Sequence, residues 1–458
     1  MKAISPADQL FLWLEKRQQP MHVGGLLLFS FPEEAPDDYV AQLAGQLREE
    51  RRVSQPFNQR LVTRFGQPYW DEDRHLDLEH HFRFEALPTP GRIRELLAFV
   101  SAEHGHLMDR QRPLWEFHLV EGLRDRQFAV YAKVHHSLVD GVSAMKMLQQ
   151  MVSESPEERQ QAPFWALPER RRRSTDQPRS SVVQAMGRLL GESGKQLGTI
   201  PTVARELMKT INEARKHPDY DSMFHAPQCL LNQTITGSRR FAAQSFSLTR
   251  IQALADTYHA TVNDIVTAMS ASALRTYLMN QDGLPDQSLI AMIPMSLHNR
   301  SGGGDAGNQV GMILASLGTH LADPVQRLGH IRESIQTAKD RYASMSSEEI
   351  INYTALTLAP AGFHLLTGMA PKWQTFNVVI SNVPGPKQPG YWNGAKLEGM
   401  YPVSIAMDRM ALNMTLTSYC DQVEFGLIGC RRTLPSLQRM LDHLEDGLAE
   451  LEQAAGIQ

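Results

Sequence analysis

Two adjacent histidines at the end of an apolar segment are the residues in this sequence best suited to chemistry. The segment Phe128–Val134 has the composition of a β-strand and leads directly into His135 and His136. Successive side chains of a strand point to opposite faces, so the two imidazoles cannot both enter one cleft. We therefore expect one histidine to face a substrate channel and the other to be packed or hydrogen-bonded behind it.

The residues that follow the histidines favour a turn and the start of a helix. In the segment HHSLVDG, the Asp140 carboxylate can accept hydrogen bonds from the local backbone, and Gly141 tolerates a strained φ angle. Histidine has a reference pKa of about 6.5 and suits a general base, which contributes roughly 10²–10⁴ in rate. That contribution suffices to move an acyl group from an activated thioester to an alcohol, with no covalent enzyme intermediate.

Other interpretations of the histidines have less support. Adjacent histidines also occur at 80–81, without a glycine turn behind them. A metal site at His136 and Asp140 lacks a third and a fourth ligand nearby, so we expect no metal. No GxSxG motif is present for a serine hydrolase, and Gly191–Lys195 departs from a phosphate loop because a glutamine follows where Ser or Thr is required.

The elements that must position these residues alternate between helical and strand patterns, which predicts an α/β protein of two lobes with mixed sheets. We expect an N-terminal lobe at 1–153, a basic and partly helical linker at 154–240, and a C-terminal lobe at 241–458. The predicted helices are Ala7–Lys16, Arg92–Gly105, Val182–Lys216 in part, Thr249–Tyr258, Val262–Leu278, Pro324–Tyr342 and Leu434–Ala455. The predicted strands are Val23–Phe31, Leu114–Val120, Phe128–Val134, Ser288–Pro294, Val310–Gly318, Phe376–Ser381, Met400–Ala406, Met410–Tyr419 and Gln422–Gly429.

Composition restricts the class of protein further. The chain has 458 residues, of which 42% are apolar, and this suits a folded protein of more than one domain. Its formal net charge of −4 provides no basic field, so nucleic acid is not expected as a partner. The separated cysteines Cys229, Cys420 and Cys430 indicate free thiols in a reducing compartment.

Two segments bear on contact with lipid or CoA. Between residues 165 and 240 there are thirteen Lys or Arg against seven Asp or Glu, typical of a solvated linker face or of a contact with CoA phosphates or anionic lipid. The charge-free segment Ile351–Ala370 contains a proline and several polar residues, whereas a spanning helix needs roughly 20 mainly apolar residues. We expect a buried helix pair there, although Thr354–Met369 could line an apolar tunnel. The start of the chain lacks the order of a signal peptide, so we expect a cytoplasmic protein, with peripheral membrane contact left open.

Four further segments accompany the histidine pair in an order that resembles a known family. They are PLW at Pro113–Trp115, ND at Asn263–Asp264, GNQV at Gly307–Val310 and SNVPGP at Ser381–Pro386. Together with HHSLVDG they resemble the CoA-dependent acyltransferase superfamily with its HHxxxDG motif, and within it the bacterial wax ester synthase/diacylglycerol acyltransferases. The resemblance covers nearly the whole chain. The sequence differs from the family at His298, where relatives usually carry Arg. It also lacks the DFGWG segment of other branches.

This resemblance implies two chloramphenicol-acetyltransferase-like lobes joined by a helical linker, with the active-site channel between them. His136 matches the general base, His135 a positioning residue, and Asp140, before Gly141, the aspartate that holds the loop. The residues implied along the substrate channel are Pro113, Leu114, Trp115, Asn263, Asp264, Ser381 and Asn382. Each also has a structural alternative: a turn or core filling for the PLW residues, helix capping for the ND residues and a rigid turn for SNVPGP.

The activity implied by the resemblance is transfer of a long-chain acyl group from acyl-CoA to a long-chain alcohol, which produces wax esters. Diacylglycerol is implied as a second acceptor, which would give triacylglycerol. No cofactor is implied, because acyl-CoA is a substrate, and the expected lipid partner is a peripheral membrane or lipid-droplet surface. Two alternatives stay open: an acyltransferase for a small polar or amine acceptor, and a degenerate acyl-binding scaffold.

Overall fold

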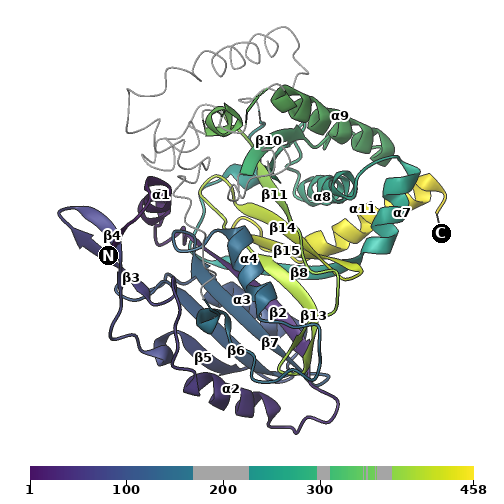
Figure 1. Cartoon of the computed structure of the whole chain (residues 1–458). Coiled ribbons are helices and arrows are strands. Elements are labelled where there is room, and N and C mark those ends of the chain that lie inside the picture. The colour runs from purple at the N-terminus through teal and green to yellow at the C-terminus, as the bar shows by residue number, and fades with distance from the viewer. Residues whose placement is uncertain are drawn as a thin grey trace.

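Two six-stranded sheets, one in each lobe, organise the chain (Figure 1). The computed structural model describes residues 1–168, 226–296, 310–357 without 344, 347, 348 and 356, and 374–457. The predicted helical linker Val182–Lys216, His298 and most of Ile351–Ala370 lie outside the described residues. None of the helices in the described ranges has the length and the apolar composition that crossing a bilayer requires.

The sheet of the first lobe has the strand order β12-β13-β2-β7-β6-β5, which places β7 in its interior. All neighbouring strands are antiparallel except β5 and β6, so the sheet is mixed. Nearly every residue of β7 is buried, as expected for a strand covered on both faces. The strands from the N-terminal part of the chain are β2 (His22–Ser30), β5 (Phe82–Ala86), β6 (Trp115–Leu123) and β7 (Gln127–His135).

Helices cover both faces of this sheet. On one face, α2 (Tyr39–Glu49) and α4 (Gly141–Gln150) share an apolar cluster with Val134 of β7. On the other face, α3 (Ile93–Glu103) shares a cluster with Tyr131 of β7. Because side chains alternate along β7, the row of Val134 leads toward His136 on the α4 face, and the row of Tyr131 leads toward His135 on the α3 face.

The sheet of the second lobe has the order β10-β9-β11-β14-β15-β8, with β11 parallel to both of its neighbours. Its helices share one large apolar cluster with the sheet and lie together on one side of it (Figure 1). The helices are α7 (Leu248–Thr257), α8 (Val262–Met279), α9 (Pro324–Ala343) and α11 (Arg439–Ala455). The strands are β8 (Arg239–Ser247), β9 (Ile290–Ser296), β10 (Val310–Ser316), β11 (Val378–Val383), β14 (Leu412–Tyr419) and β15 (Gln422–Cys430).

One pair of strands departs from the predicted division of the chain. β12 (Tyr391–Trp392) and β13 (Ala395–Val403) lie in the range expected for the C-terminal lobe, yet β13 pairs with β2 in the first sheet. β13 also packs closely over β15, where a Cβ on Gly426 would lie 1.9 Å from the carbonyl oxygen of Pro402. Gly426 therefore permits the close approach. Residues 391–403 therefore belong to the sheet of the first lobe, and they connect the two lobes because β13 also packs on β15.

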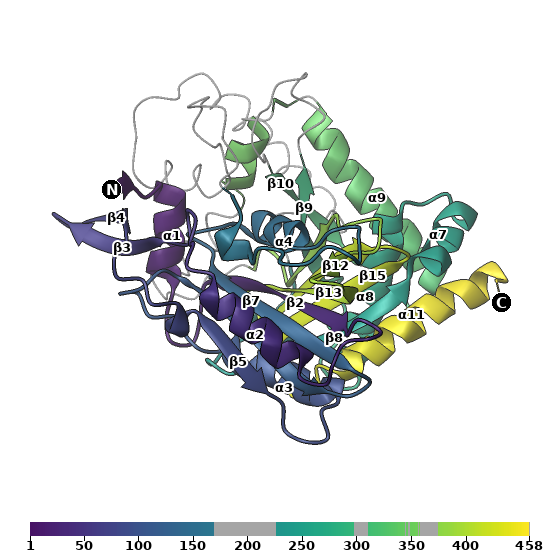
Figure 2. The same cartoon turned by 60° about the horizontal axis from the view of Figure 1, so that its bottom comes forward.

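A small third sheet, which the sequence did not predict, lies beside the first lobe. Its order is β1 (Lys2–Ala3), β4 (Gln67–Glu72) and β3 (Gln59–Arg64), and β3 and β4 form a hairpin. Helix α1 (Pro6–Leu14) follows β1 and packs its Leu12 into an apolar cluster with β4. In both views the hairpin projects from the edge of the molecule beside α1 (Figures 1 and 2). The small sheet thus fixes the helix that reaches the histidine pair.

Candidate active site

The backbone of the histidine pair is held from both sides at the end of β7. The amide of His135 donates to the carbonyl oxygen of Leu114, at 3.0 Å, just before β6. The amide of His136 donates to the carbonyl oxygen of Met21, at 2.9 Å, just before β2. The strand therefore ends between two fixed partners, and both imidazoles start from defined positions.

The His136 ring lies against Phe11 of α1, with ring centroids 4.0 Å apart and an angle of 20° between the planes. The residue is partly exposed, whereas its Nδ1 atom is buried and, within the described residues, makes no hydrogen bond to another residue. Nε2 is thus the nitrogen open to a reactant. Burial lowers the pKa of His136 to about 4. The negative charge of Asp140 and a hydrogen bond with the His136 backbone raise the pKa, but burial has the larger effect. An imidazole with this pKa is unprotonated at neutral pH, as a general base must be.

His135 is fully buried and hydrogen-bonded, as the alternation along the strand predicts for one of the pair. Its Nδ1 accepts from the amide of Ser137 at 3.1 Å and lies 2.6 Å from the hydroxyl of the same residue. Since Nδ1 accepts, the proton of the neutral ring is on Nε2, which lies 3.3 Å from a carboxylate oxygen of Glu15. His135 therefore has a fixed tautomer and does not face a substrate.

Glu15, directly after α1, is a site residue that the sequence analysis missed. Its carboxylate accepts from the Met21 amide at 3.2 Å and from the Arg110 guanidinium at 2.9 and 3.1 Å. Burial raises the pKa of Glu15, but the contact with His135, the hydrogen bond from the Met21 amide and the charge of Arg110 together bring the pKa below its usual value. Glu15 thus ties the His135 side chain to the segment that holds the His136 backbone. No local motif marks it, because its partners are far away in sequence.

Asp140 is the N-cap of α4. Its carboxylate accepts from the amide of Ser143 at 2.8 Å and from the hydroxyl of the same residue at 3.0 Å. This geometry fits the predicted loop-holding role. The expectation that Gly141 has a strained φ is wrong. Its φ is not positive, and a Cβ would meet only Val23, at 3.9 Å. A strained backbone therefore does not explain the glycine.

The PLW segment supports the site from the core. The Trp115 ring is buried, donates from its indole nitrogen to the Phe57 carbonyl oxygen at 2.7 Å, and stacks on His81 and Trp165. The Leu114 side chain is buried with the small sheet, and Pro113 bridges to β3. Trp115 therefore lies in the core, as the structural alternative predicts, and not along a channel. The segment contributes to the site through the Leu114 carbonyl oxygen, which accepts from the His135 amide.

Asn263 and Asp264 lie at the start of α8. The Asp264 amide donates to the Thr261 hydroxyl at 3.2 Å, and the Asp264 carboxylate accepts from the Thr261 amide at 2.8 Å. This reciprocal pair is a capping box, the structural alternative for these residues. Asn263 is half-buried, and its carbonyl oxygen accepts from the Thr267 hydroxyl. Across the described ranges, neither residue is hydrogen-bonded to the histidine loop.

Ser381 and Asn382 lie in β11 of the second lobe, half-buried and exposed respectively. The turn that follows approaches the first lobe, because the side-chain amide of Gln149 on α4 donates to the carbonyl oxygen of Pro384 at 3.4 Å. In the views of Figures 1 and 2, α4 lies near the middle of the molecule. This turn therefore brings the second lobe next to the helix that starts at the histidine loop.

An apolar pocket lies between β2, β7 and α4, on the face of β7 that leads to His136. Its free space is small, about 10 Å³, which is room for a single water molecule. A Cβ on Gly25 would come within 2.4 Å of Leu148, so a side chain there would fill the space between β2 and α4. The lining has no charged residue; it consists of Gly24, Gly25, Ala132, Val134, Ala144, Met147, Leu148 and Phe164.

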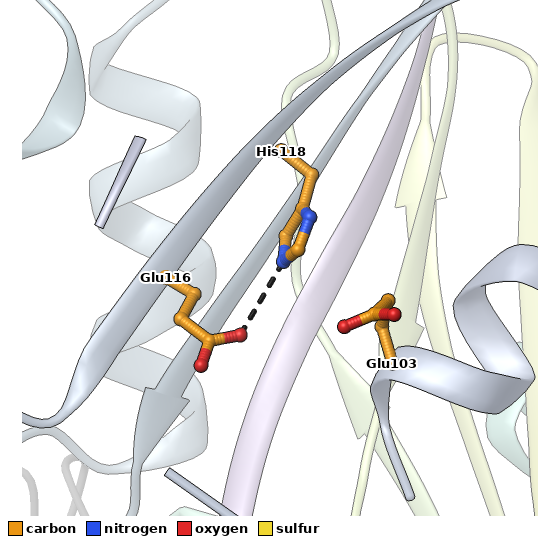
Figure 3. Close-up of side chains that lie close together, drawn as sticks. All are labelled: Glu103, Glu116 and His118. Carbon is orange, nitrogen blue, oxygen red and sulfur yellow. Dashed lines mark hydrogen bonds and ion pairs between the residues drawn. The ribbon is translucent and has the colours of Figure 1, made fainter. Parts of the chain in front are cut away.

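One cluster in the described part of the chain has the spacing of metal ligands. Glu103, Glu116 and His118 bring their ligand atoms within 4.8 Å of one another on the α3 side of the sheet (Figure 3). The buried Lys133 ammonium lies 2.7 Å from the Glu116 carboxylate. Burial raises the pKa of Glu116, but His118 and Lys133 bring it to about 2. Lys133 already supplies the positive charge here, so the cluster is an ion-pair network away from His136.

Two family models match this chain. The wax ester synthase/diacylglycerol acyltransferase catalytic domain matches residues 4–266, and the C-terminal domain of the same family matches residues 306–452. An O-acyltransferase named WSD, from Acinetobacter baylyi, is 46% identical over 454 residues, which cover 99% of this chain and 97% of that protein. A probable diacylglycerol O-acyltransferase of Mycobacterium tuberculosis is 41% identical over 463 residues, which cover 100% of both chains.

Solved structures give a consistent result. A wax ester synthase/diacylglycerol acyltransferase from Marinobacter aquaeolei aligns with a TM-score of 0.83 at 66% identity, covering 100% of both chains. The first condensation domain of the calcium-dependent antibiotic synthetase aligns with a TM-score of 0.60 at 14% identity, covering 99% of this chain and 96% of that one. At that identity the second likeness concerns the fold alone. The predicted two-lobed α/β fold with mixed sheets is confirmed.

Proposed function

Because the chain belongs to the wax ester synthase/diacylglycerol acyltransferase family, we propose that it is an O-acyltransferase that moves a long-chain acyl group from acyl-CoA to a long-chain alcohol, with diacylglycerol as a second acceptor. The observation that carries the proposal is His136, a partly exposed imidazole whose pKa is lowered and whose backbone is held at the end of β7. No cofactor is part of the proposal, because the thioester of acyl-CoA is already activated.

His136 acts as the general base in the proposed reaction. Its Nε2 takes the proton of the alcohol hydroxyl as the alcohol oxygen bonds to the thioester carbonyl carbon. The carbon–sulfur bond then breaks, the ester is released, and the imidazolium returns the proton to the CoA sulfur. Asp140 favours the transient imidazolium, because its negative charge raises the pKa of His136 against the effect of burial.

A long-chain substrate requires an apolar lining near His136. Each buried methylene contributes about 0.8 kcal/mol, so a long chain gains most where the lining carries no polar group. The side chains between β2, β7 and α4 form such a lining on the His136 face of the sheet, and the space between them has to widen before an acyl chain can enter. Because the proposed acceptors partition into lipid, we include peripheral contact with a membrane or lipid-body surface in the proposal.

Transfer is proposed to be direct, within a ternary complex. A covalent route would need a nucleophile near His136, and all three cysteines lie far from His136 in the sequence. Burial raises the pKa of the Cys430 thiol, yet hydrogen bonds from Thr236 and Thr433 bring it to about 7. Cys430 is fully buried at the end of β15, where it cannot meet an incoming thioester.

A CoA-release assay with palmitoyl-CoA tests the proposal. Hexadecanol, a diacylglycerol and a small polar amine are compared as acceptors, with His136→Ala as the inactive control. We expect the fastest release with hexadecanol, measurable release with diacylglycerol, and intersecting initial-rate lines. Fastest release with the amine would favour a small polar acceptor. Binding of palmitoyl-CoA without release to any acceptor would favour a scaffold, and parallel lines with a labelled protein would show a covalent route.

A further inference from the structure

Two aromatic side chains are exposed on the small sheet and its helix. Phe65, at the tip of the β3–β4 hairpin, is fully exposed, and Trp13 of α1 is 62% exposed. Large aromatic side chains are usually buried in a folded protein, so two on one projecting unit call for an explanation. Both lie in the part of the molecule that projects beside the first lobe (Figures 1 and 2).

The turn at the hairpin tip does not account for Phe65. Arg64 pairs with Gln67, so Phe65 and Gly66 form a two-residue turn, with φ values of +50° and +77°. Such a turn favours Asn or Asp before the glycine, and a bulky side chain is unfavourable at positive φ. The hairpin therefore holds a phenylalanine in solvent where both packing and backbone geometry favour another residue.

Exposed basic side chains accompany each of these aromatics. Arg64 precedes Phe65 at the tip, Lys2 lies in β1 and Arg17 follows α1; all three are exposed, whereas Arg60 lies at the far end of the hairpin, opposite Asp71. The acidic residues of this sheet, Asp71 and Glu72, lie at the other end of β4, and Asp71 pairs with the chain's amino group. An aromatic tip flanked by arginine is complementary to anionic phospholipid headgroups above an apolar interior.

The same helix contacts the catalytic residues. Phe11 stacks on the His136 ring, and Glu15, directly after α1, contacts His135. Leu12 packs against the strand β4 of the hairpin, and Trp13 is the next residue along. Phe11, which faces the general base, and Trp13, which faces solvent, are therefore two residues apart and point to nearly opposite sides of one short helix. A surface bound by Trp13 and Phe65 would lie across α1 from the active site.

We propose that the β3–β4 tip and the exposed side of α1 form a docking surface for a phospholipid bilayer that carries anionic headgroups. Phe65 and Trp13 insert among the headgroups and upper acyl chains, and Arg64 pairs with phosphate. The inference rests on the proposed function, in that a lipid acceptor then leaves the bilayer next to His136. It goes beyond that function by assigning the surface.

The test is sedimentation of the full chain with vesicles of phosphatidylcholine alone and of phosphatidylcholine with phosphatidylglycerol. Phe65→Asn suits the turn, so it should keep or raise Tm while raising the lipid concentration for half-binding by about tenfold. Trp13→Gln, at an exposed helix position, should act in the same direction. Arg64→Gln should weaken binding only when phosphatidylglycerol is present. Met279→Gln, a matched change at an exposed apolar helix position in the second lobe, should bind as wild type.

Two further measurements keep this inference separable from the proposed function. CoA release with a water-miscible alcohol should be unchanged in Phe65→Asn, whereas release with vesicle-borne hexadecanol should fall with binding. A tryptophan placed at position 65 by Phe65→Trp should be quenched by brominated lipid. Wild-type binding by a variant that carries both Phe65→Asn and Trp13→Gln, or a concentration-dependent dimer that Phe65→Asn dissolves, would overturn the proposal. Vesicle binding that needs Phe65 without CoA release to any acceptor would instead reject only the proposed function.

Discussion

Helices α4 and α8 each have an aspartate at the N-terminal end that accepts from a backbone amide, but the two aspartates have different surroundings. At α4, Asp140 accepts from the Ser143 amide, and at α8, Asp264 accepts from the Thr261 amide, both at 2.8 Å. The residues before α4 belong to a strand end held between two neighbours, with His136 beside it. The residues before α8 form a loop after α7 in the second lobe. An aspartate that caps a helix therefore indicates an active site only when the residues before the helix include a reactive group such as His136.

Of the substitutions at the two helix starts, His136→Ala should have the largest effect on kcat. Loss of the base should lower kcat by roughly 10²–10⁴, while Tm changes little because the side chain is partly exposed. Steady-state kinetics and a thermal melt measure the two effects. Asp264→Ala provides the comparison, with kcat near wild type. Near-normal turnover of the His136 variant at unchanged Tm would show that His136 is not the general base.

The pH dependence should separate His136 from an ordinary histidine. Because burial lowers its pKa to about 4, the acid limb of kcat/KM should lie near pH 4 and not near 6.5. Between pH 4 and pH 6.5 the unfolded chain binds a proton at His136 that the folded chain does not bind. The free energy of unfolding therefore falls as the pH drops through this range. His136→Ala should therefore lose less stability than wild type between pH 7 and pH 5. An acid limb near 6.5 would contradict the lowered pKa of His136.

Glu15→Gln should weaken the link between α1 and the histidine pair. Glutamine keeps an acceptor for the Met21 amide but loses the charge beside His135, and a hydrogen bond to a charged group contributes about 1.5 kcal/mol or more. We expect kcat to fall about tenfold with little change in KM. Glu95→Gln, which removes a surface partner of Arg92, is the matched control and should leave kcat unchanged. Equal KM and kcat effects would instead indicate a substrate contact.

Substitutions of Asp140 should distinguish capping from chemistry. Asp140→Ala removes the cap and should cost about 1 kcal/mol of stability, whereas Asp140→Asn retains a favoured N-cap residue. Activity should follow stability, so the asparagine variant should keep more of both. If both variants lose activity at wild-type Tm, the carboxylate acts directly on the reaction.

The smallest effect on turnover is expected from Asp264→Ala. Loss of the capping box should lower the free energy of unfolding by about 1 kcal/mol, measured by urea denaturation, and leave kcat within about twofold of wild type. A loss of kcat at unchanged stability would place the start of α8 in the substrate channel, as the family resemblance implies.

The sequence predicted what is local and missed what depends on tertiary contact. The end of β7 and the Asp140 cap could be predicted because their residues lie within one short segment. Glu15 could not, because His135 is its neighbour only in the folded chain. The β3–β4 hairpin escaped detection since Phe65-Gly66 lacks the usual Asn or Asp turn signal. Trp115 belongs to the motif yet fills the core, so a motif position does not establish contact with substrate.

The pairing of β13 with β2 has a consequence for synthesis of the chain on the ribosome. Gly24 of β2 pairs with Val403, so the first sheet cannot be completed until most of the polypeptide has been translated. Until then β2 is an unpaired edge with a row of apolar residues, the kind of edge that recruits other strands. Nascent chains that stop before β13 should therefore depend on chaperones, and a gene fragment that encodes only residues 1–153 should give insoluble protein.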